Sequence, residues 1–322
     1  MKLLLFPLLL GSVGLAVAAD PPTVTVTDIS QGGMMRAAVA INDSGEVVGY
    51  GDLGGASRAL LLRNGELIDL GALSGLLDSR AASINERGQI AGHGTKVGGT
   101  ERHALLWNAE GEPLDIHPLS TAWSWASAIN DRGDVVLNFV PEGGIPNVAL
   151  WKEASLFPLG PGIGQAINRQ GLVVGTSRWK HGKEFPLHLG DDSRATAVND
   201  DGVVVAYDIR HSWGDAFLQR FPRNERAPLM PLPGDTIAVP FGIDGRGRVV
   251  GISMFCEWEC NVPETRAVYW EEGTAIPLPP LGPYWSCVAR GINDVGEVVG
   301  FCGDWCTRED CLRSRAVLWR LE

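Results

Sequence analysis

Two short segments combine basic and aromatic side chains and could bind an anionic or sugar-like ligand. They are Arg178-Trp179-Lys180-His181 and Arg210-His211-Ser212-Trp213. Guanidinium and ammonium groups can hold a carboxylate, whether on a uronic acid or on a protein side chain. An exposed tryptophan can stack on a sugar ring or anchor a protein partner. The alternative is that both segments are ordinary solvated loops, because charged residues are mostly exposed.

The eleven tryptophans of the chain divide into two groups. Four of them close a repeated apolar phrase and are expected in the core, namely Trp107, Trp151, Trp270 and Trp319. We expect the other seven in loops on one face and treat them as candidate ligand-binding residues: Trp123, Trp125, Trp179, Trp213, Trp258, Trp285 and Trp305. The alternative is that each ring packs beneath its own loop, since tryptophan is highly buried on average.

Catalytic motifs are missing from the sequence. No nucleophile elbow, zinc-binding helix signature, phosphate loop or calcium loop occurs. A glycosidase needs two placed carboxylates, and no spacing marks such a pair. We therefore expect a non-catalytic binding protein without cofactor or metal. A carbohydrate-active hydrolase or lyase remains the alternative, and it would use the following loop residues: His181, His211, Glu257, Glu259, Asp304, Glu309 and Asp310. A purely structural envelope protein is a third possibility.

All six cysteines lie in the last part of the chain, at Cys256, Cys260, Cys287, Cys302, Cys306 and Cys311. An even number of cysteines in an exported chain predicts disulfides, because that compartment oxidises thiols. Zinc is the competing interpretation, since two cysteine pairs are each four residues apart. Six cysteines permit about 15 pairings, so the sequence does not select one.

The N-terminus predicts export. Met1 and Lys2 precede an apolar run that ends in small residues, which is typical of a secretory signal peptide over residues 1–19. Residues 20–322 would then form one secreted or periplasmic domain, without membrane insertion. The net charge of −11 makes nucleic acids and anionic membranes poor partners. A glycan or an extracytoplasmic protein is the expected partner.

One phrase recurs seven times along the chain. Its first copy, residues 40–49, reads Ala-Ile-Asn-Asp-Ser-Gly-Glu-Val-Val-Gly. The asparagine position returns at Asn85, Asn130, Asn168, Asn199, Asp244 and Asn293. The mean spacing of about 42 residues is typical of four-stranded propeller blades. The sequence therefore predicts an all-β fold, a seven-bladed β-propeller.

Each copy should supply four strands. The Asn-x-x-Gly turn joins the first two, and a second hairpin follows, as at residues 104–116. The fourth copy is short and could lack one strand. The last copy ends after its third strand, so residues 24–29 are expected to complete it and close the ring. Small residues at alternating positions, such as Ala38 and Ala40, are expected to face a crowded central axis.

The combination of this phrase with x-Ala-Phe/Leu-x-Trp resembles the HAF family of extracellular repeat proteins. His103-Ala104-Leu105 and Asp215-Ala216-Phe217 each keep part of the His-Ala-Phe triplet that names the family. The resemblance covers nearly all of residues 20–322. It implies export and a repeated architecture, and it supplies no catalytic residues.

Overall fold

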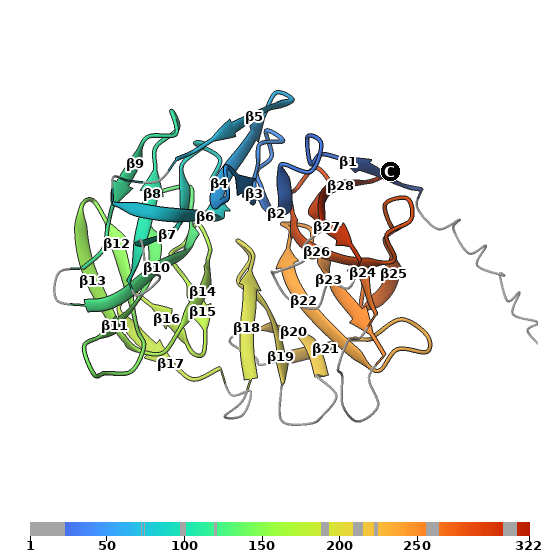
Figure 1. The fold of residues 1–322 in the computed structure, drawn as a ribbon. Coiled ribbons are helices and arrows are strands. Elements are labelled where there is room, and N and C mark those ends of the chain that lie inside the picture. Colours follow the sequence, from blue (N-terminus) through green and yellow to red (C-terminus); the bar gives the residue numbers. More distant parts are fainter. Residues whose placement is uncertain are drawn as a thin grey trace, which may run out of the picture.

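The structure is a computed structural model of the chain. It describes residues 23–71, 73, 75–96, 101–118, 121–187, 193–208, 215–221, 225–255, 264–304 and 314–322. Within these ranges the regular structure consists of β-strands, without helices, arranged as sheets around a ring (Figure 1). The all-β class and the β-propeller architecture that the repeats predict are therefore confirmed. Among these residues, no helix has the length and apolar character needed to cross a membrane.

Five sheets have four strands each, and they are paired antiparallel from the ring axis outward. The first contains β2 (Met35–Ile41), β3 (Val47–Leu53), β4 (Ala56–Arg63) and β5 (Glu66–Asp69). The second contains β14 (Gly164–Ile167), β15 (Val173–Gly175), β16 (Arg178–Lys180) and β17 (Lys183–Phe185). The third contains β18 (Ser193–Val198), β19 (Val203–Asp208), β20 (Asp215–Arg220) and β21 (Glu225–Leu229). The fourth contains β22 (Ile237–Ile243), β23 (Val249–Met254), β24 (Thr265–Glu271) and β25 (Thr274–Pro277). The fifth contains β26 (Ser286–Ile292), β27 (Glu297–Gly303), β28 (Arg315–Leu321) and β1 (Val24–Asp28).

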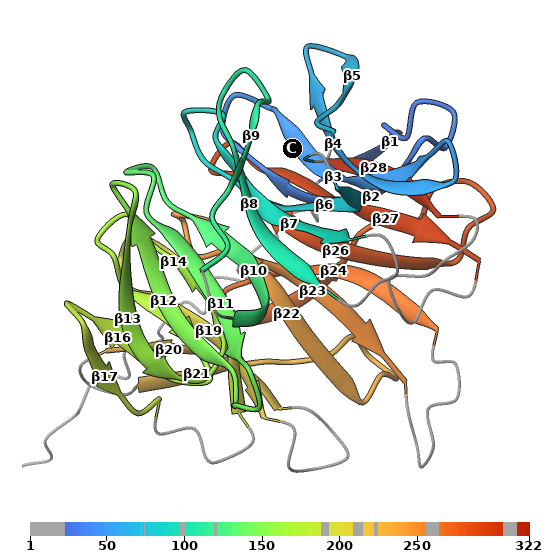
Figure 2. The ribbon, with the colours of Figure 1, turned by 60° about the vertical axis from the view of Figure 1, so that its left-hand side comes forward.

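The prediction of seven separate blades is wrong. Besides the five four-stranded sheets there is one eight-stranded sheet, which contains the second and third repeats. Its strands are β6 (Leu76–Ile84), β7 (Ile90–Lys96), β8 (Arg102–Trp107), β9 (Pro113–Asp115), β10 (Thr121–Ile129), β11 (Val135–Pro141), β12 (Asn147–Lys152) and β13 (Ser155–Pro161). The two halves are joined where Trp123 of β10 pairs in parallel with Arg102 of β8 (Figure 2). A contact between repeats leaves no trace in the repeat pattern itself, so the sequence could not reveal it.

The fourth repeat has all four strands, although they are short. β16 follows β15 after a two-residue connection, and β17 pairs with β16. Trp179 therefore lies in a strand and is 1% exposed, so its predicted loop position is wrong. It pairs with Val173, as Trp107 pairs with Ile90. Trp179 is thus another member of the core tryptophan series.

The Asn-x-x-Gly phrase builds the same turn in each repeat. In the first copy the amide of Gly45 donates to the carbonyl of Asn42 at 3.0 Å. The side-chain oxygen of Asn42 accepts from the amide of Glu46 at 2.9 Å. Gly45 has a φ of +77°, which residues with a Cβ rarely adopt. The asparagine thus caps a tight turn, and it is buried.

The N-terminal strand closes the ring, as the sequence predicts. β1 pairs antiparallel with β28 over five residue pairs, from Val24–Leu321 to Asp28–Val317. Figure 1 shows these two ends of the chain lying together beside β2. Pairing the first strand with the last removes the open edge that β28 would otherwise expose.

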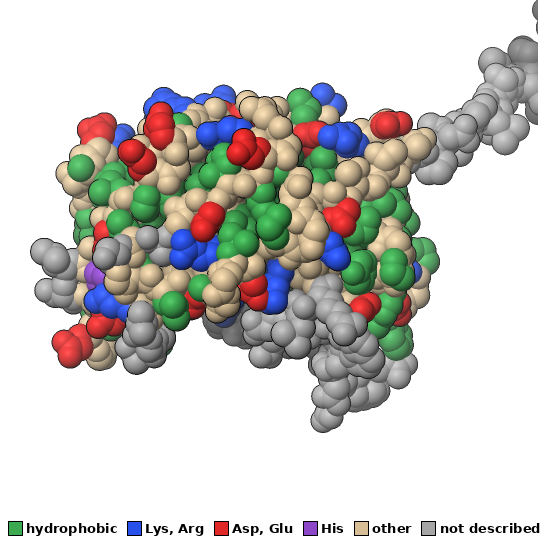
Figure 3. Space-filling view, turned by 45° about the horizontal axis from the view of Figure 1, so that its top comes forward, with side chains coloured by type: hydrophobic (Ala, Val, Ile, Leu, Met, Phe, Trp, Pro, Cys, Tyr) green, Lys and Arg blue, Asp and Glu red, His purple; other side chains and the backbone are tan. Residues whose placement is uncertain are grey.

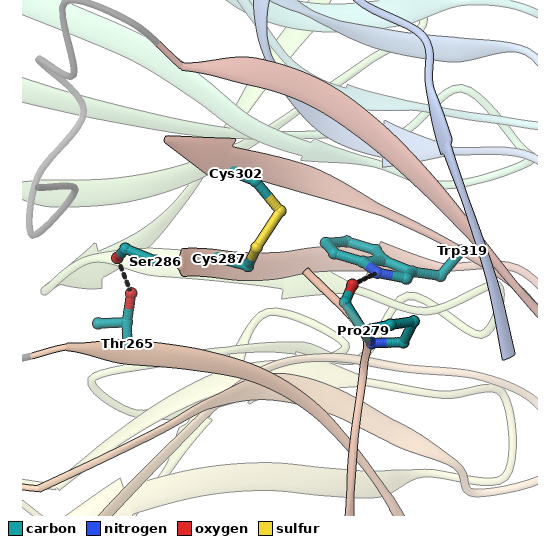
Figure 4. Close-up of a disulfide and its surroundings, with 6 residues drawn as sticks. All are labelled: Thr265, Pro279, Ser286, Cys287, Cys302 and Trp319. Atoms are coloured by element: carbon teal, nitrogen blue, oxygen red, sulfur yellow. Dashed lines mark hydrogen bonds between the residues drawn. A yellow bond between two sulfur atoms is a disulfide. The ribbon is translucent and has the colours of Figure 1, made fainter. Parts of the chain in front are cut away.

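Buried tryptophans connect neighbouring sheets. The indole Nε1 of Trp107 donates to the carbonyl of Leu70 at 3.0 Å, and that of Trp319 donates to the carbonyl of Pro279 at 2.7 Å (Figure 4). In each case the acceptor follows the outermost strand of the preceding repeat. The apolar core therefore lies between the faces of adjacent sheets, and these two tryptophans also satisfy their polar groups there.

A disulfide joins Cys287 of β26 to Cys302 of β27, with a Cα–Cα distance of 4.1 Å (Figure 4). The two residues are direct cross-strand partners, and both are buried. The disulfide prediction is confirmed for this pair. Both cysteines lie in strands. The other four lie outside the described residues: Cys256, Cys260, Cys306 and Cys311.

Candidate functional site

A cavity of about 310 Å³ lies at the ring axis. Its walls come from the inner strands of six repeats, because Val39, Ala82, Gln165, Thr196, Phe241 and Arg290 all line it. Arg194 and Tyr207 complete its polar side. The volume is near the lower end of the range of about 300–1,000 Å³ that small-molecule sites occupy.

A recurrent irregularity in the inner strands creates this lining. In every repeat the pairing of the first two strands shifts register between the two small residues, for example between Ala38 and Ala40 and between Ala289 and Gly291. The residue between them is left unpaired, and a β-bulge of this kind redirects side chains. Among the small residues only Ala195 lines the cavity, so the expectation that all of them face the axis is wrong. Ala38 and Ala289 are fully buried, and the residues after them, Val39 and Arg290, line the cavity.

Aromatic rings hold two arginines on this side of the ring. The guanidinium carbon of Arg290 lies 4.6 Å from the ring centre of Phe241 and 6.0 Å from that of Phe301. The guanidinium carbon of Arg80 lies 4.5 Å above the ring of Tyr50. Stacking of this type restrains the position of a guanidinium.

Three polar side chains at the cavity have no intramolecular partner among the described residues. They are the guanidinium of Arg194, the amide of Gln165 and the hydroxyl of Tyr207. Arg194 and Gln165 are exposed, and Tyr207 is half-buried. Donors and acceptors that converge on one concave site without partners are typical of a ligand site.

In the second repeat, two arginines lie close enough to His93 to affect its pKa. Burial, together with the charges of Arg102 and Arg80, lowers the pKa of His93 to about 3. His93 is the cross-strand partner of Arg80, as Tyr207 is of Arg194. His93 is therefore neutral near pH 7, and no carboxylate contributes to its shift. Figure 3 shows acidic and basic side chains intermixed on the face it displays.

The Asn-x-x-Gly turns surround a second axial cavity of about 260 Å³. Six carboxylates line it. Asp244 pairs with Arg248 of its own turn, and the other five are those of Asp43, Glu86, Asp131, Asp200 and Asp294. Each accepts a backbone N–H from a neighbouring turn, as Glu86 does from Asp43 at 3.0 Å. Burial is the largest influence on the carboxyl group of Glu86 and raises its pKa. The hydrogen bond from Asp43 lowers the pKa, and the surrounding carboxylates raise it. Among the described residues no group of three His, Cys, Asp or Glu side chains could hold a metal ion, and these carboxylates are accounted for by the turn hydrogen bonds.

The structure places the predicted aromatic residues in different regions. Trp123 and Trp125 lie in β10 instead of a loop, with Trp123 52% exposed. Trp125 pairs with Asn138. It occupies the same position in its inner strand as Arg194 and Arg80 do in theirs. Trp285 lies in a loop as predicted and lines a separate outer groove with Leu278. The aromatic candidates therefore do not form one surface.

The basic segment of the fourth repeat is a hairpin and not a loop. Arg178 is in β16, and His181 is in the turn before β17, at the same edge of the sheet as the Asn168 turn. The guanidinium of Arg178 lies between the rings of Phe221, at 3.9 Å, and Phe185, at 5.0 Å. Its proposed partners Arg210, His211 and Trp213 lie outside the described residues, as do Trp258 and Trp305.

One histidine cluster has the residue types of a catalytic site. His103 and His117 stack with ring centres 4.0 Å apart, and His117 Nδ1 lies 2.7 Å from Ser124 Oγ. Ser124 is fully buried, and its hydroxyl accepts the amide of Ala104 at 2.9 Å. Ser79 makes the equivalent bond to Ala59 at 3.0 Å. The serine therefore links adjacent repeats and is not placed to attack a substrate.

Sequence reasoning missed the residues of the axial cavity. Their signal is nevertheless present, since the inner strand of each repeat reads small–variable–small before the Ile-Asn or Val-Asn phrase. The variable residues are Val39, Ala82, Ser127, Gln165, Thr196, Phe241 and Arg290. A position whose residue differs between repeats, while the residues on both sides of it stay small, is a candidate for ligand recognition.

Comparison with known proteins identifies the fold alone. No protein-family model matches the chain, and no curated protein matches it in sequence. Solved structures match it at a level that shows only the fold. A prolyl endopeptidase superposes with a TM-score of 0.59 at 11% identity over 84% of this chain. This chain spans 46% of that protein, which is about half its length.

Two smaller propeller structures match over nearly their whole length. The β-propeller domain of the Trilobed protease from Pyrococcus furiosus has a TM-score of 0.58 and 11% identity, covering 88% of this chain and 94% of its own. Oligogalacturonate lyase from Vibrio parahaemolyticus has a TM-score of 0.58 and 10% identity, with coverage of 94% and 98%. These similarities support a propeller scaffold.

Proposed function

We propose that this chain is an exported, non-catalytic β-propeller that binds an anionic ligand in the axial cavity lined by Arg194 and Arg290. The observation that carries the proposal is the convergence of these two arginines on one cavity, with Arg194 lacking an ion pair among the described residues. A guanidinium forms strong, charge-assisted hydrogen bonds with carboxylates and phosphates. The net charge of −11 makes a positive site an exception in this molecule.

Export and family membership are part of the same proposal. The apolar N-terminal run over residues 3–17 supports a signal peptide, and the disulfide of Cys287 fits an oxidising compartment. The repeated phrase supports placement with the HAF-type repeat proteins.

The test is calorimetric titration of the oxidised protein with three anions: citrate, inorganic phosphate and galacturonate. Arg194→Gln and Arg290→Gln should each weaken binding of any anion that the wild type binds by about tenfold or more, since each removes a charged hydrogen bond. Arg246→Gln is the matched control, because Arg246 is an exposed arginine in an Asn-x-x-Gly-type turn. The proposal fails if the wild type binds none of the anions, or if all three variants bind equally well.

A further inference from the structure

We infer that the ligand of the axial cavity is a sugar acid, bound as a single uronic acid residue. This inference rests on the proposed function, because it assigns the carboxylate of that ligand to Arg194 and Arg290. It adds what the other lining residues would recognise, and it thereby separates a sugar acid from a simple anion.

The cavity has more hydrogen-bonding groups than a simple anion would use. The amide of Gln165 supplies both donors and an acceptor, and the hydroxyl of Tyr207 can act in either role. Neither side chain makes a hydrogen bond within the described residues, yet both border the same cavity as the arginines. Sulfate carries only acceptors, so it would leave the acceptor of Gln165 unused. A ligand with hydroxyls around its carboxylate would satisfy the amide and the phenol together.

Apart from Thr196, the remaining lining is apolar and lies beside these groups. Val39, Ala82, Ala195 and Phe241 contribute to the same cavity. Behind them, Tyr50, Ile252 and Phe301 belong to one apolar cluster that Val39 and Phe241 pack against. A pyranose has C–H groups on the faces of its ring and hydroxyls at its edge, so it matches a site with apolar and hydrogen-bonding walls.

Size restricts the ligand further. The inner strands of six repeats surround the cavity, and its volume is about 310 Å³. We therefore assign one sugar residue to it, either as a free uronic acid or as the end of a longer chain. The small residues Ala82 and Ala195 leave this space, whereas Phe241 and Arg290 define its limits.

The experiment compares galacturonate, galactose, acetate and citrate by calorimetric titration of the oxidised protein. Galacturonate should bind at least tenfold more tightly than either acetate or galactose, because only galacturonate uses both the arginines and the hydroxyl-binding groups. Tyr207→Phe and Gln165→Ala should each weaken galacturonate binding by about fivefold, as expected for one hydrogen bond, and leave citrate binding unchanged. Arg194→Gln should weaken both. A trimer of galacturonate that binds like the monomer would assign one residue to the cavity.

The outcomes separate the two proposals. If citrate binds and depends on Arg194 while galacturonate binds no better than acetate, the sugar-acid inference is wrong and the anion site stands. The same holds if Tyr207→Phe and Gln165→Ala leave galacturonate binding unchanged. If no anion binds, both proposals fail. A trimer that binds at least tenfold more tightly than the monomer would overturn the assignment of a single residue.

Discussion

The side-chain amide of Asn293 donates a hydrogen bond of 3.0 Å to the backbone carbonyl of Asn42, which lies 251 residues earlier. The same bond links successive repeats around the ring, with each asparagine donating to the next copy. The series is interrupted at Asp244, which has no amide donor. Its carboxylate instead pairs with Arg248 at 2.6 Å. A buried chain of amides thus fixes the spacing of the turns at one end of the axis.

We expect Asn293→Ala to lower the free energy of unfolding by about 1–3 kcal/mol, because the buried carbonyl of Asn42 would lose its donor and the amide of Glu297 its acceptor. Urea denaturation would measure the change. Val295→Ala is the matched control, since Val295 lies in the same turn and is 60% exposed. Equal stability of the two variants would show that this bond does not hold the ring closed.

Removal of β1 should expose the edge of β28 and destabilise the whole ring. We expect a chain that begins at Ile29 to melt at a lower temperature, because it loses five residue pairs with β28. A synthetic peptide of residues 23–28 should restore part of the loss when added in excess. A shortened chain that melts at the wild-type temperature would contradict this role of β1, and so would a peptide without effect.

The sequence predicts the hairpins and the closure of the ring because both depend on local, repeated chemistry. The glycine at position 45 and its counterparts identify the turns, and the truncated last copy identifies the missing strand. The pairing of Arg102 with Trp123 depends on contact between repeats, so the merged sheet could not be predicted from the phrase. The position of Trp179 was missed because the strands of the fourth copy are short and only two residues separate β15 from β16.

The site was harder to predict than the fold. Strict alternation along the inner strand would direct Ala38 and Ala40 to the axis. The register shift between them reverses this arrangement and turns Val39 toward the cavity. In the first copy the glycine at the end of the phrase packs closely against the bulged strand. A Cβ on Gly49 would lie 1.9 Å from the carbonyl oxygen of Ala37. The same register shift occurs in the copies that have Leu137 or Ala206 at this position. The glycine therefore does not identify the bulge, and the direction of the side chains required coordinates.

Stability should fall as the pH is lowered below about 6.5, and His93 should contribute to this fall. Its pKa is about 3 in the folded protein, while an unfolded histidine titrates near 6.5. Between these values the unfolded chain binds a proton that the folded chain does not, so the contribution is fully present above pH 6.5 and is lost toward pH 3.

His93→Asn tests this contribution, because Asn138 occupies the corresponding register position in the next repeat. Urea denaturation at pH 7 and pH 5 would give the difference in unfolding free energy for each protein. We expect that difference to be smaller in the variant, by up to about 1.4 kcal/mol per pH unit. An identical pH dependence in the two proteins would show that His93 does not titrate as described.

Two buried tryptophans at equivalent positions differ in one hydrogen bond. Trp107 Nε1 donates to the carbonyl of Leu70 at 3.0 Å, whereas Trp179 Nε1 is buried and has no partner among the described residues. Both side chains are at most 1% exposed. Replacement by phenylalanine removes the same atoms from each, so the loss of packing should be similar. Only Trp107→Phe also leaves a carbonyl without its donor.

We therefore expect Trp107→Phe to cost about 1–2 kcal/mol more unfolding free energy than Trp179→Phe, because removal of an unpaired buried donor carries no hydrogen-bond penalty. Chemical denaturation of the two variants and the wild type would measure both costs. Each variant serves as the control for the other, since the substitution and the burial are matched. If Trp179→Phe lowered the unfolding free energy as much as Trp107→Phe, the indole Nε1 of Trp179 would have a hydrogen-bond partner. The assignment of Trp179 as a buried tryptophan without such a bond would then be wrong.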